Sequence, residues 1–545
     1  MNYPAGIRPL KIKEFSNAHV NFIQPLDEDQ SFDVHLQDEA WGQMSGLQQY
    51  NACTSNFQWI IKRALEKQLS VRAIGSGWSL SKVAMSDDAI IHTKRCRHKF
   101  NLSEENFAPA YLAQGHRAED YRFLQCGNTI IDISRYLEEE SNPPKCLRVS
   151  GGSNGQTIVG AFSTNTHGAA IGYGSLPDMI VGMHIITGPD RHIYVERASR
   201  KITSAAFHEK IGAEVVHDDE LFNAALVSFG SFGIIHGVLV EVEDKFLLEQ
   251  KLRRVPYDDR LDDAVTNNNY DAISDYLRYS ADDRAHPLYH FELAINPHDF
   301  AFNDPEKGAY LRGMHKVPYR SDYNRIDAPG QGYTYGDDTL GFMQTVLDKA
   351  SVGGFLSRGL IPKLVNSLFD LAYDRPDDAV GTIGETFRNT VFRGKLFSAA
   401  LGVDRKNVRR VIDISLEVNK RIKLAGVLAM RFVKGTRATL GFTKWENTCV
   451  VELDGVDARI NHNFVKELGR RLQAEGIIYT LHWGKINRLL TGPLLEWMYG
   501  EEALTDWKKQ RSRVMTREVQ HLFNNEFMER CDLDEYVPYT VPHLA

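Results

Sequence analysis

The stretch VRAIGSGWSLSKVAMSDDAIIHT, residues 71–93, joins two short apolar runs through a loop of small residues. We predict strands at 71–74 and 89–93, because apolar and β-branched residues dominate both runs. Between them, residues 75–79 contain two glycines, two serines and a tryptophan. Glycine lets backbone N–H groups turn toward a ligand, and successive N–H groups can bind a phosphate oxygen. The loop is therefore either a tight turn or part of a nucleotide site.

Two more loops of the same kind follow along the chain. They are SGGSNGQTIVGAFSTNTHGAA at 150–170 and FGSFGII at 229–235. Three loops of small and hydroxyl residues in one region favour a shared pyrophosphate site over three separate turns. None of them contains GxGxxG or GxxxxGK[ST], so the sequence predicts neither a standard dinucleotide-binding fold nor a P-loop.

The segment GGSNG at 151–155 offers a competing interpretation, because it matches the GxSxG motif of serine hydrolases. That motif needs a strand before the serine and a helix directly after it. The residues that follow, QTIVGAF, are β-branched and interrupted by Gly160, which is a poor start for a helix. A hydrolase with Ser153 as nucleophile is therefore the less favoured alternative.

The segment HWGK at 482–485 places a histidine, a tryptophan and a lysine at the end of a predicted strand. Taken alone, it could be an ordinary strand end with a solvated lysine. His, Cys and carboxylate residues with metal-binding spacing do not accompany it, so we expect no metal site.

Bulk properties limit the class of protein. A chain of 545 residues predicts two or more domains, and 43% apolar with 25% charged residues is typical of soluble globular proteins. The net charge of -7 gives no basic footprint for nucleic acid. Six scattered cysteines without a CxxC pair indicate reduced thiols and a cytoplasmic location. We expect neither a signal peptide nor a transmembrane helix.

Hydrophobic periodicity predicts the remaining elements. We expect a helix at 55–70 capped by Thr54 or Ser55, and a second, aromatic-rich domain beginning near residue 244 with amphipathic patterns at 340–375. The other expected elements are a hairpin at 183–195, a helix from Asp219, strands at 428–435 and 448–455, a helix at 463–476 and a strand at 477–487.

Four stretches, in this order along the chain, resemble the flavoprotein oxidases of the vanillyl-alcohol oxidase type, whose FAD-binding fold is called PCMH-type. They are RAIGSGWS, GAFSTNTHGAA, ELFNAALVSFGSFGIIHGVLVEV and HWGK. HWGK is similar to the signature of the sugar-1,4-lactone and alditol oxidase branch. The resemblance implies an α+β fold: a two-subdomain PCMH-type FAD-binding domain plus a substrate (cap) domain built on a mixed sheet with flanking helices.

From this we predict four regions. They are an N-terminal lead-in at 1–45, which looks irregular, an FAD-binding domain at 46–243, a substrate domain at 244–480 and a C-terminal segment at 481–545 that returns to the FAD-binding domain.

Carried over position by position, the resemblance implies a set of cofactor-binding residues. They are Ile74, Gly75, Ser76, Gly77, Trp78, Ser79, Ser153, Gly160, Ser163, Thr164, Thr166, His167, Gly168, Gly230, Gly233 and Ile234. Trp78 departs from the family, since many relatives have a histidine there that is bonded to the flavin 8α position. Tryptophan cannot form that bond, so we expect FAD to bind non-covalently or to be linked from another residue.

The resemblance also implies the catalytic residues. Lys485 would lie near flavin N1 and C2=O, where a cation stabilises the negative charge of reduced flavin. The lactone and alditol oxidases carry a Glu-x-Arg pair on a strand; Arg431 matches its arginine, but Ala429 stands where the glutamate would be. Glu452, on the neighbouring predicted strand, could supply the carboxylate instead. We expect His482, or second Glu452, to be the general base.

The function implied is an FAD-dependent oxidoreductase. A hydride would pass from a substrate carbon bearing OH or NH to flavin N5, and molecular oxygen or another acceptor would reoxidise the flavin. The partner is then a small-molecule substrate. Two alternatives stay open: an oxidase of the same superfamily acting on sterols or other bulky alcohols, and a flavin-binding protein without turnover.

Overall fold

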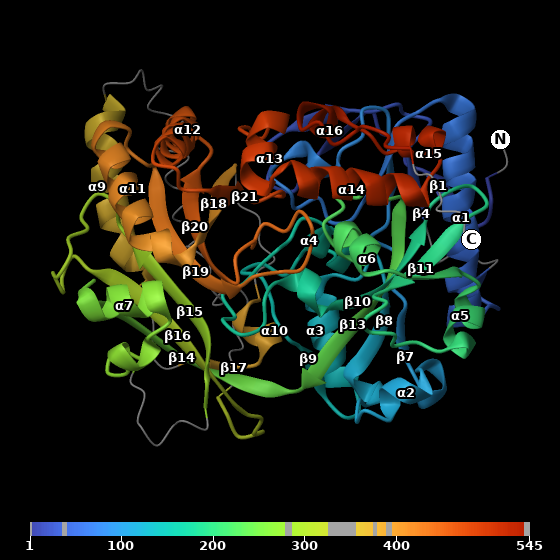
Figure 1. The fold of residues 1–545 in the computed structure, drawn as a ribbon, viewed down its shortest axis with the longest axis horizontal. Helices are drawn as coiled ribbons and strands as arrows, with labels where there is room; N and C mark the ends of the chain where they lie inside the picture. Colours follow the sequence, from blue (N-terminus) through green and yellow to red (C-terminus); the bar gives the residue numbers. More distant parts are fainter. Residues whose placement is uncertain are drawn as a thin grey trace.

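The computed structural model describes residues 3–34, 41–277, 286–324, 356–373, 379–388 and 395–538. Helices and strands are interspersed along the chain, and Figure 1 shows them gathered into two lobes. One lobe holds the first half of the chain together with the C-terminal helices, and the other holds the segment between them. The α+β class predicted from the sequence is confirmed. The boundaries of the four regions stay predictions.

The first sheet carries the first glycine loop and includes N-terminal residues. Across the sheet its strands are β1 Ile7–Pro9, β4 Phe32–Val34, β6 Ala89–His92 and β5 Val71–Ile74. Residues 1–45 were expected as an irregular lead-in, but they supply two of these strands and the hairpin of β2 (Glu14–Ser16) with β3 (Ile23–Pro25). The backbone N–H of Ala18 donates to Gly77 O, which ties this segment to the first loop.

Helix α1 spans Gly46–Lys67 and begins earlier than the sequence indicated. Ser45 is its N-cap, and the Ser45 and Gln48 side chains bond each other's backbone N–H groups in a capping box. Thr54 and Ser55 lie inside the helix, so the predicted cap is wrong. The reciprocal bonds of Ser45 and Gln48 satisfy two backbone N–H groups, whereas a single hydroxyl would satisfy one. The predicted buried face of the helix, including Phe57, Ile60 and Ile61, packs into the core.

The second sheet has seven strands and forms the body of the first lobe. They are β12 Glu214–His217, β11 His192–Glu196, β10 Ile180–Ile186, β13 Ile234–Asp244, β8 Tyr121–Gln125, β7 Lys99–Asn101 and β9 Lys145–Leu147. Strands β10 and β11 form the predicted antiparallel hairpin. Helices in this lobe are α2 Pro109–Leu112, α3 Ile130–Arg135, α4 Ile158–Ser163, α5 Ala205–Ile211 and α6 Asp219–Leu226. Asp218 caps α6, one residue before the predicted start.

The third sheet dominates the second lobe. Its eight strands are, in order, β17 Ala379–Gly381, β14 Phe246–Val255, β16 Ala309–Pro318, β15 Leu288–Ile295, β19 Gly426–Lys434, β20 Asn447–Val456, β18 Leu396–Asp404 and β21 Tyr479–Leu481. Every pairing in it is antiparallel, so the mixed sheet expected for this domain is not what forms. The physical reason is that β15–β16 and β19–β20 are hairpins, which require antiparallel neighbours.

Helices cover both faces of the third sheet (Figure 1). On one face lie α7 Asp259–Asn267, α11 Val408–Arg421 and α12 Arg459–Ala474. Helix α11 contacts the other two, and α12 contacts β20. On the other face α9, Leu356–Tyr373, packs on Val427 and Val456, and the short α10, Ile383–Thr386, contacts α3 of the first lobe. Of the predicted amphipathic segment, residues 340–355 lie outside the described residues.

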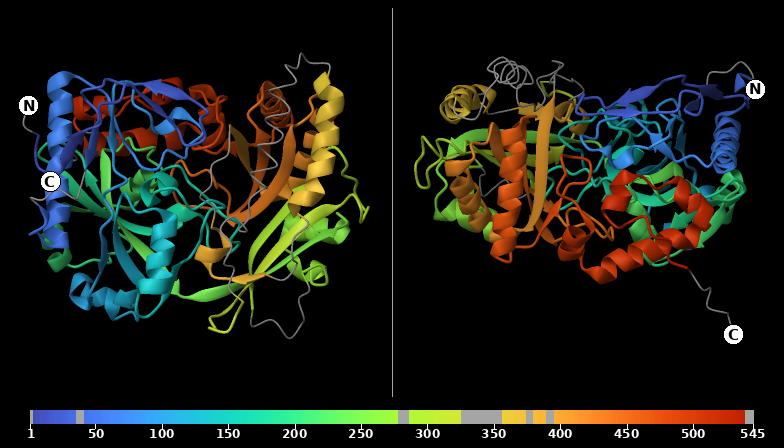
Figure 2. Two further views of the ribbon diagram at one scale, coloured as in Figure 1. Left: turned by 180° about the vertical axis from the view of Figure 1, so that it is seen from behind. Right: turned by 90° about the horizontal axis from the view of Figure 1, so that it is seen from above.

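The C-terminal helices return to the first lobe, as Figure 2 shows from two further directions. They are α13 Gly492–Tyr499, α14 Glu501–Val514, α15 Arg517–Leu522 and α16 Glu526–Arg530. Helix α14 packs against α6, and α15 contacts α1. The predicted strand at 477–487 is only β21, after which HWGK continues as a loop.

All six cysteines are buried free thiols. Within the described ranges, none of the helices has the length and apolar character that crossing a bilayer requires. The cytoplasmic location stays a prediction.

Candidate active site

One cavity is lined by residues from both lobes, and it brings most of the predicted site residues together. Of the predicted set, its lining contains Ile74, Gly75, Ser76, Gly77, Trp78, Ser79, Ser153, Gly160, Ser163, Thr164, Thr166, His167, Gly230, Gly233, Arg431, Glu452, His482 and Lys485. Gly168 and Ile234 are not part of it. Gly168 lies within the second loop, where an added Cβ would be 2.3 Å from Ser150 O, and Ile234 is fully buried in β13.

The first and second loops meet closely at glycine positions. A Cβ on Gly75 would lie 2.0 Å from Thr157 Oγ1, and a Cβ on Gly155 would lie 2.2 Å from the Trp78 ring. The hydroxyls of Ser76 and Ser163 line this part of the cavity and have no hydrogen-bond partner among the described residues. Buried polar groups are normally paired, so these hydroxyls indicate a polar ligand between the loops. The donor set fits the diphosphate of FAD.

The third loop is fixed from beneath by two buried arginines that the sequence analysis missed. Arg72 NH1 donates to Phe229 O at 2.5 Å, and Arg511 Nε donates to Ser231 O at 2.9 Å. Phe229 and Gly230 adopt positive φ angles of 55° and 73°, which expose these carbonyls to the arginines. Burial lowers the pKa of Arg72 to about 9. The sequence signal was a charged residue inside an otherwise apolar strand.

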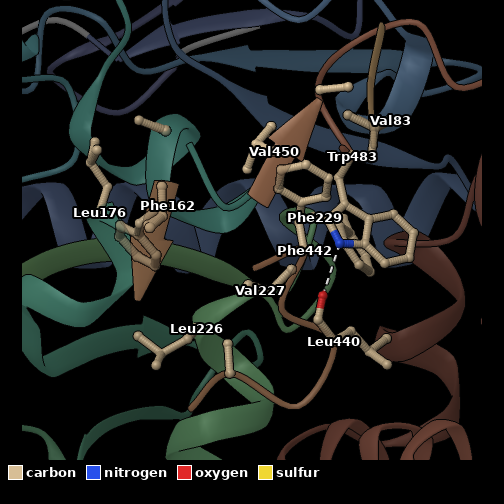
Figure 3. Packing of buried hydrophobic residues seen from close by; sticks show 14 of the residues in the cluster. Val83, Phe162, Leu176, Leu226, Val227, Phe229, Leu440, Phe442, Val450 and Trp483 are labelled. Atoms are coloured by element: carbon tan, nitrogen blue, oxygen red, sulfur yellow. Dashed lines mark hydrogen bonds between the residues drawn. The ribbon is translucent and has the colours of Figure 1, made fainter. Parts of the chain in front are cut away.

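Trp483 anchors the HWGK loop in the core between the loops and the sheet (Figure 3). Its ring centroid lies 4.4 Å from that of Phe229, and its Nε1 donates to Leu440 O at 2.8 Å. The residues just after the first loop hold HWGK in place, since the Leu80 N–H donates to Gly484 O at 2.8 Å and Ser81 Oγ donates to Trp483 O at 2.9 Å. This anchoring holds His482 and Lys485 at the cavity wall.

A buried ionic cluster forms part of the cavity wall next to the second loop, where a Cβ on Gly152 would lie 3.4 Å from the Arg431 guanidinium. The Glu452 carboxylate lies 3.2 Å from Arg431 Nε and accepts a hydrogen bond from Lys485 Nζ. Glu292 on β15 approaches the same Arg431 Nε, also at 3.2 Å. Burial acts to raise the pKa of Glu452, but Arg431 and Lys485 outweigh it and lower that pKa to about 2. Glu452 is therefore ionised throughout the physiological range.

The register of the third sheet accounts for the alanine at position 429. Ala429 on β19 lies directly opposite Glu452 on β20. Side chains of directly opposed residues lie on the same face of a sheet about 4.5–5.5 Å apart at Cβ. The carboxylate expected at 429 is thus replaced by one that reaches the same place from the neighbouring strand.

Two of the histidines that line the cavity, His167 and His482, are neutral at pH 7. Burial lowers the pKa of His167 to about 4 and that of His482 well below its usual value. His482 Nδ1 accepts the Gly484 N–H at 3.0 Å. His167 Nδ1 donates to Gly168 O at 3.0 Å, and its Nε2 lies 3.7 Å from Glu452 Oε1.

Other cavity residues escaped the sequence analysis. Asp454 follows Glu452 on the same face of β20 and accepts a hydrogen bond from Ser398 Oγ at 2.5 Å. Asn17 and His19, from the N-terminal segment, also line the cavity. Alternation along TCVVELDG could have indicated Asp454, because residues 452 and 454 of one strand must share a face. No local pattern pointed to Asn17 or His19.

Ser153 does not lie on a nucleophile elbow. Strand β9 ends at Leu147 and α4 begins at Ile158, so loop separates the serine from both. Among the described residues no histidine hydrogen-bonds to Ser153, and the hydrolase alternative loses its geometric basis.

One carboxylate cluster outside the cavity, Glu119, Asp120 and Asp244, has spacing that could hold a metal ion. The ammonium of Lys145 lies within 3.2 Å of all three carboxylates. Arg117 also contacts all three, so two cations already neutralise most of the charge of this cluster.

We predict that Gly75→Ala weakens FAD binding or the stability of the loops by about 1–3 kcal/mol, because the new methyl group overlaps Thr157. Bound flavin per chain and the melting temperature report the effect. Gly172→Ala is the matched control, since no atom lies within 4 Å of the added Cβ. Equal flavin content in both variants would contradict the close approach of the two loops.

Comparisons with known proteins agree with this geometry. Residues 52–194 match the family model described as FAD binding domain. D-arabinono-1,4-lactone oxidases from Debaryomyces hansenii and Eremothecium gossypii are 25% and 23% identical over 219 and 207 residues. Each alignment covers 38% of this chain and 33% of the relative, so the match spans about a third of these relatives' length.

Two solved structures are similar over nearly the whole chain. Cholesterol oxidase from B. sterolicum has a TM-score of 0.67 at 13% identity, covering 97% of this chain and 98% of that one. A solvent-stable cholesterol oxidase has a TM-score of 0.64 at 13% identity, with 97% and 99% covered. At this identity the likeness shows the fold alone. Residues 52–194 therefore form an FAD-binding domain, and the chain shares its overall fold with these two oxidases.

Proposed function

We propose that the protein is an FAD-dependent oxidoreductase that oxidises a CH–OH carbon of a small polar substrate. The observation that carries the proposal is the buried cluster of Arg431, Glu452 and Lys485, which faces the same cavity as the three glycine loops. Ionic groups are expensive to bury, and strongly held ones in a cleft are typical of functional sites.

The residues that line the cavity would bind the cofactor, stabilise charge and orient the substrate. Ser76, Ser163 and the loop amides would hold the diphosphate of FAD, and the bound flavin supplies the hydride acceptor. Lys485 provides a fixed cation at the cavity wall, and groups that stabilise developing negative charge typically contribute about 2.7–4 kcal/mol to catalysis. Arg431 would orient the substrate oxygen; although burial opposes it, Glu452 and Glu292 keep the pKa of Arg431 above its usual value.

The charged residues of the cavity wall favour a polar substrate. Arg431, Glu452 and Asp454 all line the cavity, and an apolar ring system against them would leave charges without polar partners. This supports a polyol or sugar lactone, in line with the lactone oxidases among the relatives. A sterol or other bulky alcohol is the second candidate, because the cholesterol oxidases match 97% of the chain. Oxygen or another acceptor would complete the cycle.

The test is anaerobic reduction of the bound flavin. We expect D-arabinono-1,4-lactone or xylitol, rather than cholesterol, to bleach the flavin absorbance of the wild type. Lys485→Met should keep its flavin but be reduced about 10²–10³-fold more slowly, because it lacks the cation. Bleaching by cholesterol alone would favour the second candidate. Flavin that none of the three probes bleaches would indicate a binding protein without turnover.

We also propose that FAD is held non-covalently. Trp78 packs edge-on to His19 with ring centroids 5.3 Å apart and lies against Gly155, and its indole cannot form the histidyl bond. On a denaturing gel, flavin fluorescence should therefore separate from the protein band. Fluorescence that migrates with the protein would overturn this, and loss of that signal in His19→Ala would locate the link at the other ring that lines this part of the cavity.

We predict that a carboxylate on β19, at position 429, can partly replace that of Glu452 on β20. Glu452→Ala leaves Arg431 and Lys485 without this partner, and breaking a buried ion pair typically destabilises by about 3–5 kcal/mol. Adding Ala429→Glu should restore part of both the melting temperature and the rate of flavin reduction, because the two positions face each other. Ala429→Glu alone is the control and should destabilise, since it places two carboxylates together. A double variant no better than Glu452→Ala would contradict the register argument.

A further inference from the structure

Two acidic side chains on β20, Glu452 and Asp454, line the cavity and have different neighbours. Glu452 lies between Ala400 on β18 and Ala429 on β19. Asp454, two residues further along the same face, pairs with Ser398 on β18. Both carboxylates line the cavity, and the structure distinguishes them by their partners.

Two cations contact the Glu452 carboxylate. Arg431 and Lys485 both contact its carboxylate and hold its pKa at about 2 despite the opposing effect of burial. A carboxylate whose conjugate acid is that strong is a poor acceptor for the proton of an alcohol. Its geometry suits a different task, which is to fix the positions of the two cations.

His482 is unsuited to accept a proton for another reason. Its Nδ1 already accepts the Gly484 N–H, so the proton of the neutral ring must lie on Nε2. The remaining nitrogen can donate a hydrogen bond but has no lone pair to offer. His167 has the opposite tautomer, but its free Nε2 faces Glu452 at 3.7 Å, and burial lowers its pKa to about 4.

Asp454 differs from Glu452 because, among the described residues, no cation contacts its carboxylate. Ser398 donates to its Oδ1; among the described residues no other side chain hydrogen-bonds to it, and no lysine or arginine nitrogen lies within 4.0 Å. The residue is half-buried and lines the cavity. Burial, then Glu452, raise the pKa of Asp454, whereas Lys485, the Ser398 hydrogen bond and Arg431 lower it, and the net shift is upward.

We infer that Asp454 is the general base of the oxidation, and that Glu452 positions the cations rather than taking the proton. The inference rests on the proposed function. In the step, the substrate O–H bond breaks and its proton goes to the Asp454 carboxylate. The C–H bond breaks with its electron pair, which passes as hydride to the bound flavin, and the C=O bond forms. One proton and one hydride leave the alcohol, so the reaction balances.

The first experiment compares Asp454→Asn and Asp454→Ala with Asp413→Asn, a control on the outer helix α11. D-arabinono-1,4-lactone, or xylitol if that is the probe that bleaches the wild type, is the substrate. A base must be ionised, so wild-type kcat/KM should rise with pH through the Asp454 pKa. Both Asp454 variants should keep their flavin, lose about 10²–10⁴-fold in the rate of flavin reduction and lose this pH limb. Added formate should partly rescue Asp454→Ala, which a merely structural residue would not allow.

A second experiment shifts the pH at which kcat/KM rises, in two opposite directions, without removing the base. Ser398→Ala deletes a hydrogen bond to the ionised form, so the limb should shift to higher pH. Glu452→Gln removes a neighbouring like charge, so the limb of the remaining activity should shift to lower pH. These shifts keep the inference open to test even if the Asp454 variants do not fold.

The outcomes separate the two proposals. A wild type whose flavin none of the probes reduces would overturn the proposed function and the base role with it. An active wild type whose Asp454 variants keep both the rate and the acid limb would overturn the base role alone. So would a limb that Ser398→Ala and Glu452→Gln leave in place.

Discussion

The site depends on one buried interaction, the Glu452 carboxylate held between Arg431 and Lys485. It joins β20 to β19 and both to the HWGK loop, which are segments 21 and 33 residues apart in sequence. Removing these charges from water is unfavourable, and packed apolar residues would often be at least as stable. Because the cluster faces a cavity instead of closing the core, its charges are available to a ligand.

The glycine loops need comparable support, and they receive it from distant parts of the chain. Arg72 and Arg511 hold the carbonyls of the third loop, while Trp483 packs on Phe229 and its carbonyl accepts from Ser81, just after the first loop. The C-terminal helix α14 supplies Arg511, so the return of the chain to the first lobe completes the cofactor site. The same anchors that shape the FAD-binding loops therefore also place Lys485.

The sequence predicted the features that depend on residues close together in the chain. The three loops were predicted because several loops of small and hydroxyl residues in one region favour a shared phosphate site, and HWGK because it resembles a family signature. Strands at 71–74 and 428–435 follow from their apolar patterns. It could not predict contacts that only sheet register creates. Ser398 and Asp454 are 56 residues apart and meet because β18 pairs with β20. Arg72, Asn17 and His19 lie in segments whose local pattern carries no sign of a ligand.

The charges around the cavity also show why a second carboxylate is useful there. Arg312, Arg431 and Lys485 face Glu292, Glu452 and Asp454, which gives three cations and three carboxylates when all are ionised. Protonation of Asp454 leaves this group with one net positive charge. If Asp454 takes the substrate proton, that charge appears as the cofactor gains an electron pair, and attraction between the two favours the products of the step. Glu452 cannot provide this response, because its two cations keep it ionised throughout.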